Sequence, residues 1–326
     1  MSNTLSAIVR TLRLEAHNII SLELVPAAGQ VFPAFEPGAH IDVHLPGLVR
    51  NYSLLNAFDA ASPRYVVAVL KDAKSRGGSK YIHEQLRVGQ TLQISAPRNN
   101  FKLDAAKPTG VPTVLLAGGI GVTPLLGMMR ELSRQGQPVK MIYCARSQAS
   151  AAYLDELQGL CDDKVSLHTH FDDAHGAPDL AQLLAGLAPE TRLYACGPSP
   201  MLDAFVSTCA ALAYAHAHIE RFAAAPLAQT ETETAASAQG YAVTLQQSGV
   251  VVQVPPGKSI LDALLDAGHN PNFSCGEGVC GSCETRIISG DVEHRDSILS
   301  ASEQAANKSM MICVSRCRSG DLVLDL

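Results

Sequence analysis

Short apolar runs separated by Gly and Pro fill the first third of the chain. The runs with strand character lie at 7–13, 19–25, 40–45, 65–69 and 91–94, and one helical stretch lies at 79–86. Many short strands at this spacing, each ended by turn residues, are typical of an antiparallel barrel. We therefore expect a β-barrel domain over residues 1–105.

The pattern changes to alternating strands and helices over residues 110–222. The predicted strands are 113–117, 139–144, 165–171 and 193–196. The predicted helices are 124–134, 151–160, 180–187 and 200–214. Because these strands are largely apolar, both faces of their sheet should be covered by helices, which predicts a parallel α/β domain.

A third block follows a segment without apolar periodicity. Residues 223–240 are mostly Ala, Thr and Glu, and we interpret them as a linker, with a weak surface helix as the alternative. Beyond them the pattern predicts a hairpin at 241–247 and 250–254, a helix at 260–266, and strands at 284–288 and 322–324. The sequence thus predicts a multidomain fold whose last domain spans 241–326.

Composition and charge exclude several classes of protein. The chain has 326 residues, of which 47% are hydrophobic and 17% charged, as in ordinary globular domains. Its formal net charge is −6 and its Lys and Arg are scattered, so no basic block indicates nucleic-acid or anionic-membrane binding. No apolar run of about 18 residues and no signal-peptide pattern are present. We expect a cytoplasmic protein.

Nine cysteines, an odd number, argue against a disulfide framework. Cys275, Cys280 and Cys283 follow a C-x4-C-x2-C spacing, and Cys313 comes 30 positions after the third of them. This is the ligand spacing of a plant-type [2Fe–2S] cluster, in which one tight loop supplies three thiolates. The spacing therefore predicts a cluster-binding domain at the end of the chain.

Zinc is the alternative for such a group of cysteines. Zinc sites usually pair short C-x2–4-C knuckles, whereas this loop interleaves its cysteines with Gly276, Gly278 and Gly281. Glycines let the backbone turn closely around a cluster and direct N–H groups at its sulfurs, which favours iron and sulfide. Cys317 follows Cys313 by four residues, but four ligands are already present, so we interpret it as an ordinary semi-buried thiol.

Two motifs in the barrel block suit a flavin. In RNYSL at 50–54, Arg50 suits a phosphate, Tyr52 suits stacking on a flat ring, and Ser53 suits a hydrogen bond to a ring nitrogen. In RGGS at 76–79, the glycines before Ser79 form an anion-binding nest that includes Gly78. The alternatives are an edge strand with an Arg and a capped helix with a flexible entry, but the two motifs together favour flavin.

A glycine-rich turn follows the first strand of the α/β block. In LAGGIGVTP at 116–124, Gly118, Gly119 and Gly121 permit close approach of the backbone to a pyrophosphate, and Thr123 can cap the helix that follows. The G-x-G-x-x-G fingerprint is absent, so a plain strand-to-helix turn is the alternative.

A second turn, CGP at 196–198, ends the last predicted strand and opens the next helix. Ligands of open α/β sheets bind at the carboxyl ends of the strands, so both turns lie on the correct edge. Cys196 would border a nicotinamide, with Gly197 beside it. The alternative for Cys196 is a small buried core residue.

In combination, these motifs resemble those of the phthalate dioxygenase reductase family, which includes the reductase component of vanillate demethylase. The resemblance covers essentially the whole chain and rests on RNYSL, RGGS, GGIGVTP, CGP, the ERF segment at 220–222 and the four cysteines, in that order. It implies a flavin barrel, an NAD domain and a C-terminal β-grasp ferredoxin domain.

The resemblance also implies cofactors and contacts. It implies FMN bound by Arg50, Tyr52, Ser53, Gly78 and Ser79, with Phe222 near the flavin ring. It places the adenosine end of NADH near Arg146, Ser147 and either Asp172 or Asp173. Only Arg146 could serve a 2′-phosphate and the nearby acids would repel one, so we expect NADH to be preferred over NADPH.

The function implied is electron transfer from NADH through FMN and the cluster to a Rieske-type oxygenase that acts on an aromatic or similar small substrate. No general acid, base or nucleophile is required, because the cofactors supply the redox chemistry. A dehydrogenase with a small diffusible acceptor is one alternative, but it has no need of a one-electron outlet. A non-enzymatic redox sensor is another, but it has no need of the nicotinamide turns.

Overall fold

The computed structural model describes residues 4–73, 75–103, 110–222 and 240–326. They form two compact units, and the chain passes from the first to the second between Arg221 and Phe222. The first unit contains a six-stranded and a five-stranded sheet, and the second contains another five-stranded sheet. The predicted linker at 223–240 lies outside the described residues except for Gly240, and the division into three domains stays a prediction.

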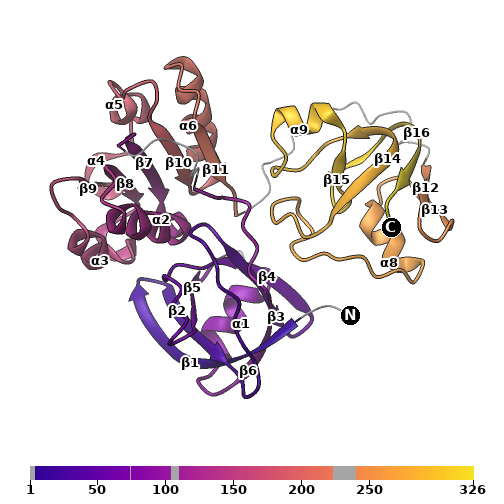
Figure 1. Ribbon diagram of the computed structural model, residues 1–326, viewed down its shortest axis with the longest axis horizontal. Helices are drawn as coiled ribbons and strands as arrows, with labels where there is room; N and C mark the ends of the chain where they lie inside the picture. The colour runs from indigo at the N-terminus through magenta and orange to yellow at the C-terminus, as the bar shows by residue number, and fades with distance from the viewer. Residues whose placement is uncertain (1–3, 74, 104–109, 223–239) are drawn as a thin grey trace. The chain divides into compact units, whose positions relative to one another are not determined.

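The six-stranded sheet is the predicted antiparallel barrel, with strand order β4-β3-β6-β1-β2-β5 (Figure 1). Alternate side chains point inward, so that Leu22 and Leu24 of β2 and Tyr65 and Val67 of β5 are fully buried together. The helix α1 packs against the same core through Ile82. The element bounds are β1 Thr4–Ala16, β2 Ile19–Pro26, β3 His40–Leu45, β4 Leu48–Ser53, β5 Tyr65–Leu70, α1 Gly78–Glu84 and β6 Thr91–Ser95.

The five-stranded sheet of the first unit is parallel, with strand order β11-β10-β7-β8-β9. Both faces are covered, since successive residues of β7 enter two different apolar clusters. The strands are β7 Thr113–Gly118, β8 Val139–Ala145, β9 Val165–Phe171, β10 Arg192–Cys196 and β11 Ala217–Glu220. The helices are η1 Gly119–Gly121, α2 Val122–Arg134, η2 Gln148–Ser150, α3 Leu154–Gly159, α4 Asp172–His175, α5 Leu180–Leu184 and α6 Ser199–Ala211.

Three features of this sheet differ from the expectation. The edge strand β11 was not predicted, because exposed Ala217 and His218 interrupt its apolar pattern. The short helix α4 was also missed. The helix predicted at 151–160 begins only at Leu154, since Tyr153 adopts a left-handed backbone conformation with φ 64° that ends the preceding turn.

Helix α2 joins the parallel sheet to the barrel within the first unit. Its Gly127 lies beside the carbonyl oxygens of Leu54 and Leu55, so the helix axis comes close to the end of β4. From the same helix, Arg130 donates a hydrogen bond to the Leu55 carbonyl. The two candidate flavin and nicotinamide segments are therefore connected by direct packing.

The second unit is a mixed sheet with strand order β13-β12-β16-β14-β15, in which β12 and β16 are parallel and the other pairs antiparallel. Helix α8, capped by the Ser259 hydroxyl, contributes Ile260, Leu261 and Leu264 to its core. The bounds are β12 Tyr241–Leu245, β13 Val251–Val254, α8 Ile260–Asp266, β14 Glu284–Glu293, α9 Ala301–Ala306, β15 Ser309–Met311 and β16 Arg316–Leu324.

Two strands of this unit are longer than expected, and α9 and β15 were not predicted. Beyond Ile287, β14 pairs irregularly with β16, and Gly290 and Gly320 interrupt the apolar alternation there.

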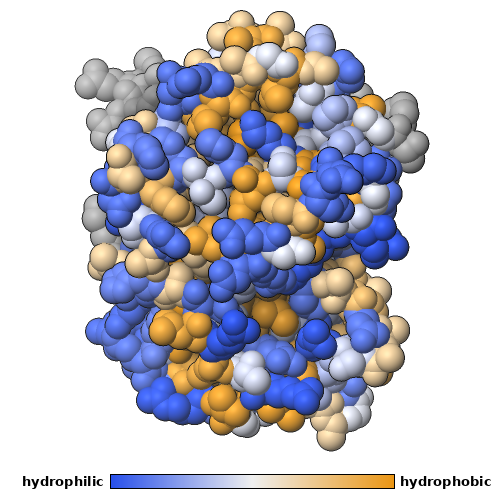
Figure 2. All heavy atoms as spheres, turned by 90° about the vertical axis from the view of Figure 1, so that its left-hand side faces the viewer, coloured by the Kyte–Doolittle hydropathy of each residue, from blue (hydrophilic) through white to orange (hydrophobic). Residues whose placement is uncertain are grey.

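Among the described residues no helix is long and apolar enough to cross a membrane. On the face of the molecule in Figure 2, hydrophilic and hydrophobic side chains are interspersed.

Candidate functional site

Arg50 connects the two candidate flavin motifs. It lies on β4, and a Cβ added to Gly78 would come within 2.7 Å of its Cγ and 3.1 Å of its Nε, so only glycine fits at the start of α1. The guanidinium donates hydrogen bonds to the carbonyl oxygens of Val49 (2.7 Å) and Arg76 (3.2 Å). The sequence predicted that these motifs form one site, and the structure brings them into contact.

The other predicted flavin residues lie close to this pair. The Tyr52 phenol has its pKa raised to about 12 by burial, an effect that the nearby Arg50 charge partly offsets. Ser53, at the end of β4, is buried. The Ser79 hydroxyl donates to Ser75 Oγ at 2.9 Å and accepts from the Asp72 amide at 3.2 Å, so it holds the loop before α1.

The two glycine-rich turns of the α/β sheet touch each other. Strands β7 and β10 are parallel neighbours, with Ala117 opposite Cys196. A Cβ at Gly121 would overlap the Cys196 carbonyl and lie 2.7 Å from the Gly197 nitrogen, and a Cβ at Gly197 would lie 2.9 Å from the Gly118 Cα. The predicted turns therefore share one edge of the sheet, where backbone N–H groups can approach an anion.

One detail of this turn was predicted wrongly. Thr123 does not cap α2, because its hydroxyl donates to the Ile120 carbonyl at 3.0 Å and no side chain caps the helix. The chain enters α2 through the short helix η1, which carries Gly119 at φ 54°. The first N–H groups of α2 are thus left without a side-chain acceptor.

The predicted adenosine-end residues lie on adjoining loops after β8 and β9. The Asp173 amide donates to the Arg146 carbonyl at 3.0 Å, which brings the two loops together. Ser147 and Ser150 form a reciprocal cap around η2. The side chains of Arg146, Asp172 and Asp173 are exposed, and Asp172 lies 4.0 Å from the His170 ring.

Glu220 is a functional candidate that the sequence reasoning named only as part of the ERF segment. It ends β11 directly opposite Cys196 of β10. Its Oε2 is inaccessible to solvent and has no hydrogen-bond partner among the described residues, although the residue as a whole is only partly buried. Burial raises the pKa of this carboxyl to about 8, which favours its protonated form.

This raised pKa predicts a pH-dependent stability. Above pH 4.5 the carboxyl ionises in the unfolded chain but stays protonated in the fold, so the stability that it contributes falls as pH rises toward 8. Each pKa unit corresponds to about 1.4 kcal/mol. We expect Glu220→Gln to gain melting temperature relative to the unmodified protein from pH 5 to 8. The exposed Glu190→Gln is the control, and a difference independent of pH would contradict the prediction.

The four predicted cluster ligands converge in the second unit. Cys283 and Cys313 approach to 3.2 Å between their sulfurs, although 30 positions separate them. Cys275 is in hydrogen-bonding contact with both Cys280 and Cys313. The Cys275 sulfur also accepts the amide of Glu277 at 3.2 Å. The thiols thus form two adjoining pairs, which suits a cluster of two irons.

These thiols are close enough to shift one another's pKa values. Contact with Cys280 and Cys313 lowers the pKa of Cys275, whereas contact with Cys275 raises the pKa of both partners. Four thiolates so close together are stable only beside positive charge. Among the described residues no group of three or more His, Cys, Asp or Glu is arranged to hold a single metal ion.

The cysteine loop requires glycine at its centre. Gly278 has φ 69°, and a Cβ there would come within 2.6 Å of a Val314 methyl group. The neighbouring Gly276 and Gly281 also have positive φ. Cys317 is fully buried in the core and donates to the carbonyl oxygens of Ser319 and Gly320, so it is a core thiol.

Phe222, which was predicted to lie near the flavin ring, has 42% of its surface exposed.

Two family models match the chain. A 2Fe-2S iron-sulfur cluster binding domain matches residues 243–318, which contain all four cysteines. The N-terminal domain of dimethylamine monooxygenase subunit DmmA-like proteins matches residues 100–219.

Several of the similar curated proteins are reductase subunits of oxygenase systems. A putative toluene-4-sulfonate monooxygenase system reductase subunit of Comamonas testosteroni is 44% identical over 100% of both chains. Vanillate O-demethylase oxidoreductase of a Pseudomonas species is 42% identical over 99% of this chain and 100% of its own.

Two solved structures have the same architecture. Phthalate dioxygenase reductase, described as a modular structure for electron transfer from pyridine nucleotides to [2Fe-2S], matches with TM-score 0.68 and 34% identity over 99% of this chain and 98% of its own. An intact type IV self-sufficient cytochrome P450 monooxygenase matches with TM-score 0.87 and 36% identity, and this chain spans 41% of its length.

Proposed function

The chain belongs to the phthalate dioxygenase reductase family, and we propose that it carries electrons from NADH through FMN and a [2Fe–2S] cluster to a Rieske-type oxygenase. The observation that carries this proposal is the convergence of four cysteines in the second unit. The first unit contains the paired glycine turns and the contact between Arg50 and Gly78. One chain therefore has the residues for a two-electron entry and a one-electron exit.

When bound, FMN would supply hydride chemistry with NADH and the cluster would supply one-electron transfer, so the redox chemistry is the cofactors' own. The residues of this chain bind and orient. Arg50 would pair with the FMN phosphate, and Gly78 lets the helix start approach it. Tyr52, Ser53 and Ser79 would complete the contacts.

The nicotinamide cofactor would lie along the carboxyl edge of the parallel sheet. Gly118, Gly119, Gly121 and Thr123 would hold its pyrophosphate at the start of α2. Gly197 and Cys196 would lie beside the nicotinamide ring, with the Cys196 side chain itself buried in the core. Phe222 would approach the flavin ring.

In the second unit, Cys275 and Cys280 would hold one iron, and Cys283 and Cys313 the other. The buried position of three of these four cysteines shields the cluster from water, while Cys275 is partly exposed. A one-electron outlet of this kind is unnecessary for a dehydrogenase with a two-electron acceptor.

NADH as donor and thiolate ligands are both consistent with the cytoplasm, which we propose as the location.

NADH should be preferred over NADPH. Asp172 and Asp173 begin α4 and are exposed, so they can accept hydrogen bonds from a ribose hydroxyl and repel a 2′-phosphate. The basic side chain that could serve a 2′-phosphate is the exposed Arg146, which begins the adjoining loop after β8. Steady-state kcat/KM values for both cofactors test the preference, and an equal or higher value with NADPH would reject it.

Arg50→Ala should weaken FMN binding by roughly ten- to a hundredfold, since charge-assisted bonds to a phosphate contribute roughly 1.5–3 kcal/mol. The [2Fe–2S] content should not change, because the cysteines lie in the other unit. Flavin retained after extensive dialysis measures the effect. Arg10→Ala, an exposed arginine on β1, is the matched control. Full flavin in the Arg50 variant would exclude a phosphate-binding role.

The decisive experiment is cofactor analysis together with partner reconstitution. The purified protein should be red-brown and contain one FMN, two irons and two labile sulfides per chain. FAD or zinc in their place would overturn the cofactor assignment. The protein should support turnover of a Rieske-type oxygenase in preference to a cytochrome P450, which the matching P450 structure makes the relevant comparison.

A further inference from the structure

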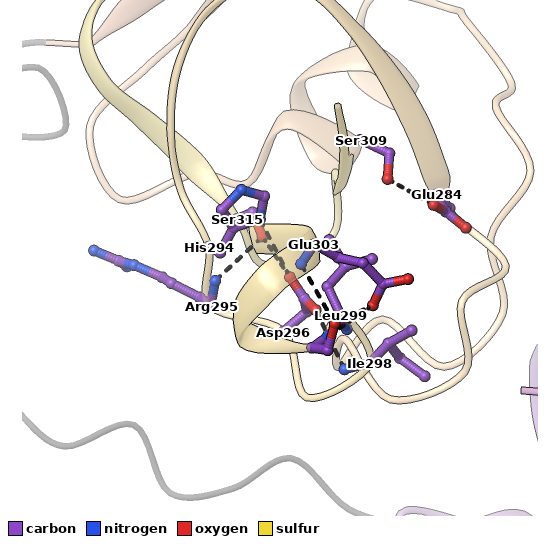
Figure 3. A network of polar contacts seen from close by, with 10 residues as sticks. Glu284, His294, Arg295, Asp296, Ile298, Leu299, Glu303, Ser309 and Ser315 are labelled. Atoms are coloured by element: carbon purple, nitrogen blue, oxygen red, sulfur yellow. Dashed lines mark hydrogen bonds and ion pairs between the residues drawn. The ribbon is translucent and has the colours of Figure 1, made fainter. Parts of the chain in front are cut away.

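A buried aspartate lies beside the cysteine site without being a ligand. Asp296 is in the loop between β14 and α9, and its side chain has no solvent exposure. Its Oδ2 accepts the amides of Ile298 at 3.2 Å and Leu299 at 2.8 Å, as Figure 3 shows. Its Oδ1 accepts the Ser315 hydroxyl at 3.3 Å. Both oxygens are therefore occupied as acceptors.

Ser315 connects this carboxylate to the turn of the fourth cysteine. It is fully buried and lies two residues after Cys313. Its amide donates to the Met311 carbonyl at 2.9 Å, which closes the turn that carries Cys313. Its hydroxyl also accepts the Arg295 amide at 3.2 Å, so the side chain is fixed from both directions (Figure 3).

The same loop contacts the centre of the three-cysteine loop. The Ser297 amide donates to the Gly278 carbonyl at 2.9 Å. A Cβ on Gly278 would lie 3.2 Å from the Asp296 Cα, so the two backbones are packed closely. Gly278 stands between Cys275 and Cys280 in the chain. The Asp296 loop thus holds both segments that supply the four thiols.

A buried carboxylate is costly unless it is paired or fully hydrogen-bonded. The nearby Arg295 guanidinium is not its partner, since it pairs with Glu293 at 2.9 Å. A basic side chain close to Asp296 is His294, whose Nδ1 lies 3.7 Å away and whose ring is largely buried. The charge of Asp296 is therefore held mainly by three hydrogen bonds.

We propose that Asp296 is a positioning residue for the cluster. Its carboxylate fixes the Cys313 turn against the Cys275–Cys283 loop and keeps a negative charge beside the irons. This inference rests on the proposed assignment of the four cysteines as ligands. It predicts that Asp296 affects both the retention of iron and the reduction potential of the cluster.

The test compares two variants of the full-length protein. Asp296→Asn keeps the size of the side chain and removes its charge, and Ser315→Ala removes the link to the Cys313 turn. Glu303→Ala is the matched control, because Glu303 belongs to the neighbouring capping box of α9 and not to this link. The readouts are the rate of iron release to a chelator, the midpoint potential, and the electron paramagnetic resonance spectrum of the reduced cluster.

We expect iron release to be roughly tenfold faster in both variants, since each loses hydrogen bonds in a buried site. The potential should become more positive in Asp296→Asn, because a negative charge is removed, and it should change less in Ser315→Ala. A purely structural role would leave the potential and spectrum of Asp296→Asn unchanged. The control should match the unmodified protein.

Release rates and potentials equal to those of the unmodified protein in both variants would overturn the inference. If Asp296→Asn does not fold, the rate of iron release in Ser315→Ala tests the inference alone, and an unchanged rate would overturn it. An unmodified protein without iron and sulfide would instead overturn the proposed cluster, and the inference with it. Flavin reduction by NADH should be unchanged throughout, which shows that the first unit is intact.

Discussion

Replacing Cys280 by serine is expected to abolish electron delivery to the oxygenase while NADH continues to reduce the flavin at a near-normal rate. Cys280 is buried and contacts the Cys275 thiol, so the alkoxide of a serine there would be a poorer iron ligand in the middle of the loop. The candidate flavin and nicotinamide residues up to Arg221 belong to the other compact unit. Loss of the cluster should therefore leave the structure of the flavin and nicotinamide sites unchanged.

Cys317→Ser is the matched control for this variant. Cys317 is also a buried cysteine of the second unit, but its thiol donates to the Ser319 and Gly320 carbonyls, which a hydroxyl can replace. The control should retain its iron and sulfide. Reduction of ferricyanide, which can take electrons from flavin directly, should largely survive in Cys280→Ser. Oxygenase turnover at the normal rate without a cluster would mean that electrons leave from the flavin.

Those parts of the fold that depend on local pattern were predictable. The strands at 40–45 and 165–171 and the helix at 260–266 have the predicted bounds, because apolar periodicity and turn residues define them. The strand β11 and the outer half of β14 were not predictable in this way. Their polar residues become strand only by pairing with β10 and β16.

The residues of the candidate site also fall into those that local sequence patterns identify and those that depend on tertiary contacts. The cysteine spacing and the glycine turns are local signals, and they identify the residues that the structure brings together. Glu220 and Asp296 depend on tertiary burial. The raised pKa of Glu220 arises because β11 pairs with β10, and Asp296 meets Ser315 across 19 residues of chain. Apart from the place of Glu220 in the ERF segment, no pattern in the sequence marks either of them.

Gly121→Ala is expected to reduce kcat/KM for NADH by roughly ten- to a hundredfold. The backbone of Gly121 has φ −61°, which suits alanine, so the effect is steric only. A Cβ there would overlap the Cys196 carbonyl and force the two cofactor turns apart. Overpacking of this kind costs about 1–3 kcal/mol. At this edge of the sheet it would displace the backbone groups that we propose to hold the pyrophosphate and the nicotinamide.

Gly159→Ala separates this effect from a general loss of stability. Gly159 ends α3 in the same unit, and a Cβ there would meet no atom within 4 Å, so its variant should match the unmodified protein. In Gly121→Ala, FMN and [2Fe–2S] contents should stay normal while stopped-flow reduction of the flavin by NADH slows. The slowing should appear mainly in the dependence on NADH concentration, because the turns bind the cofactor. Normal NADH kinetics in a folded Gly121→Ala protein would show that the cofactor binds elsewhere on the sheet.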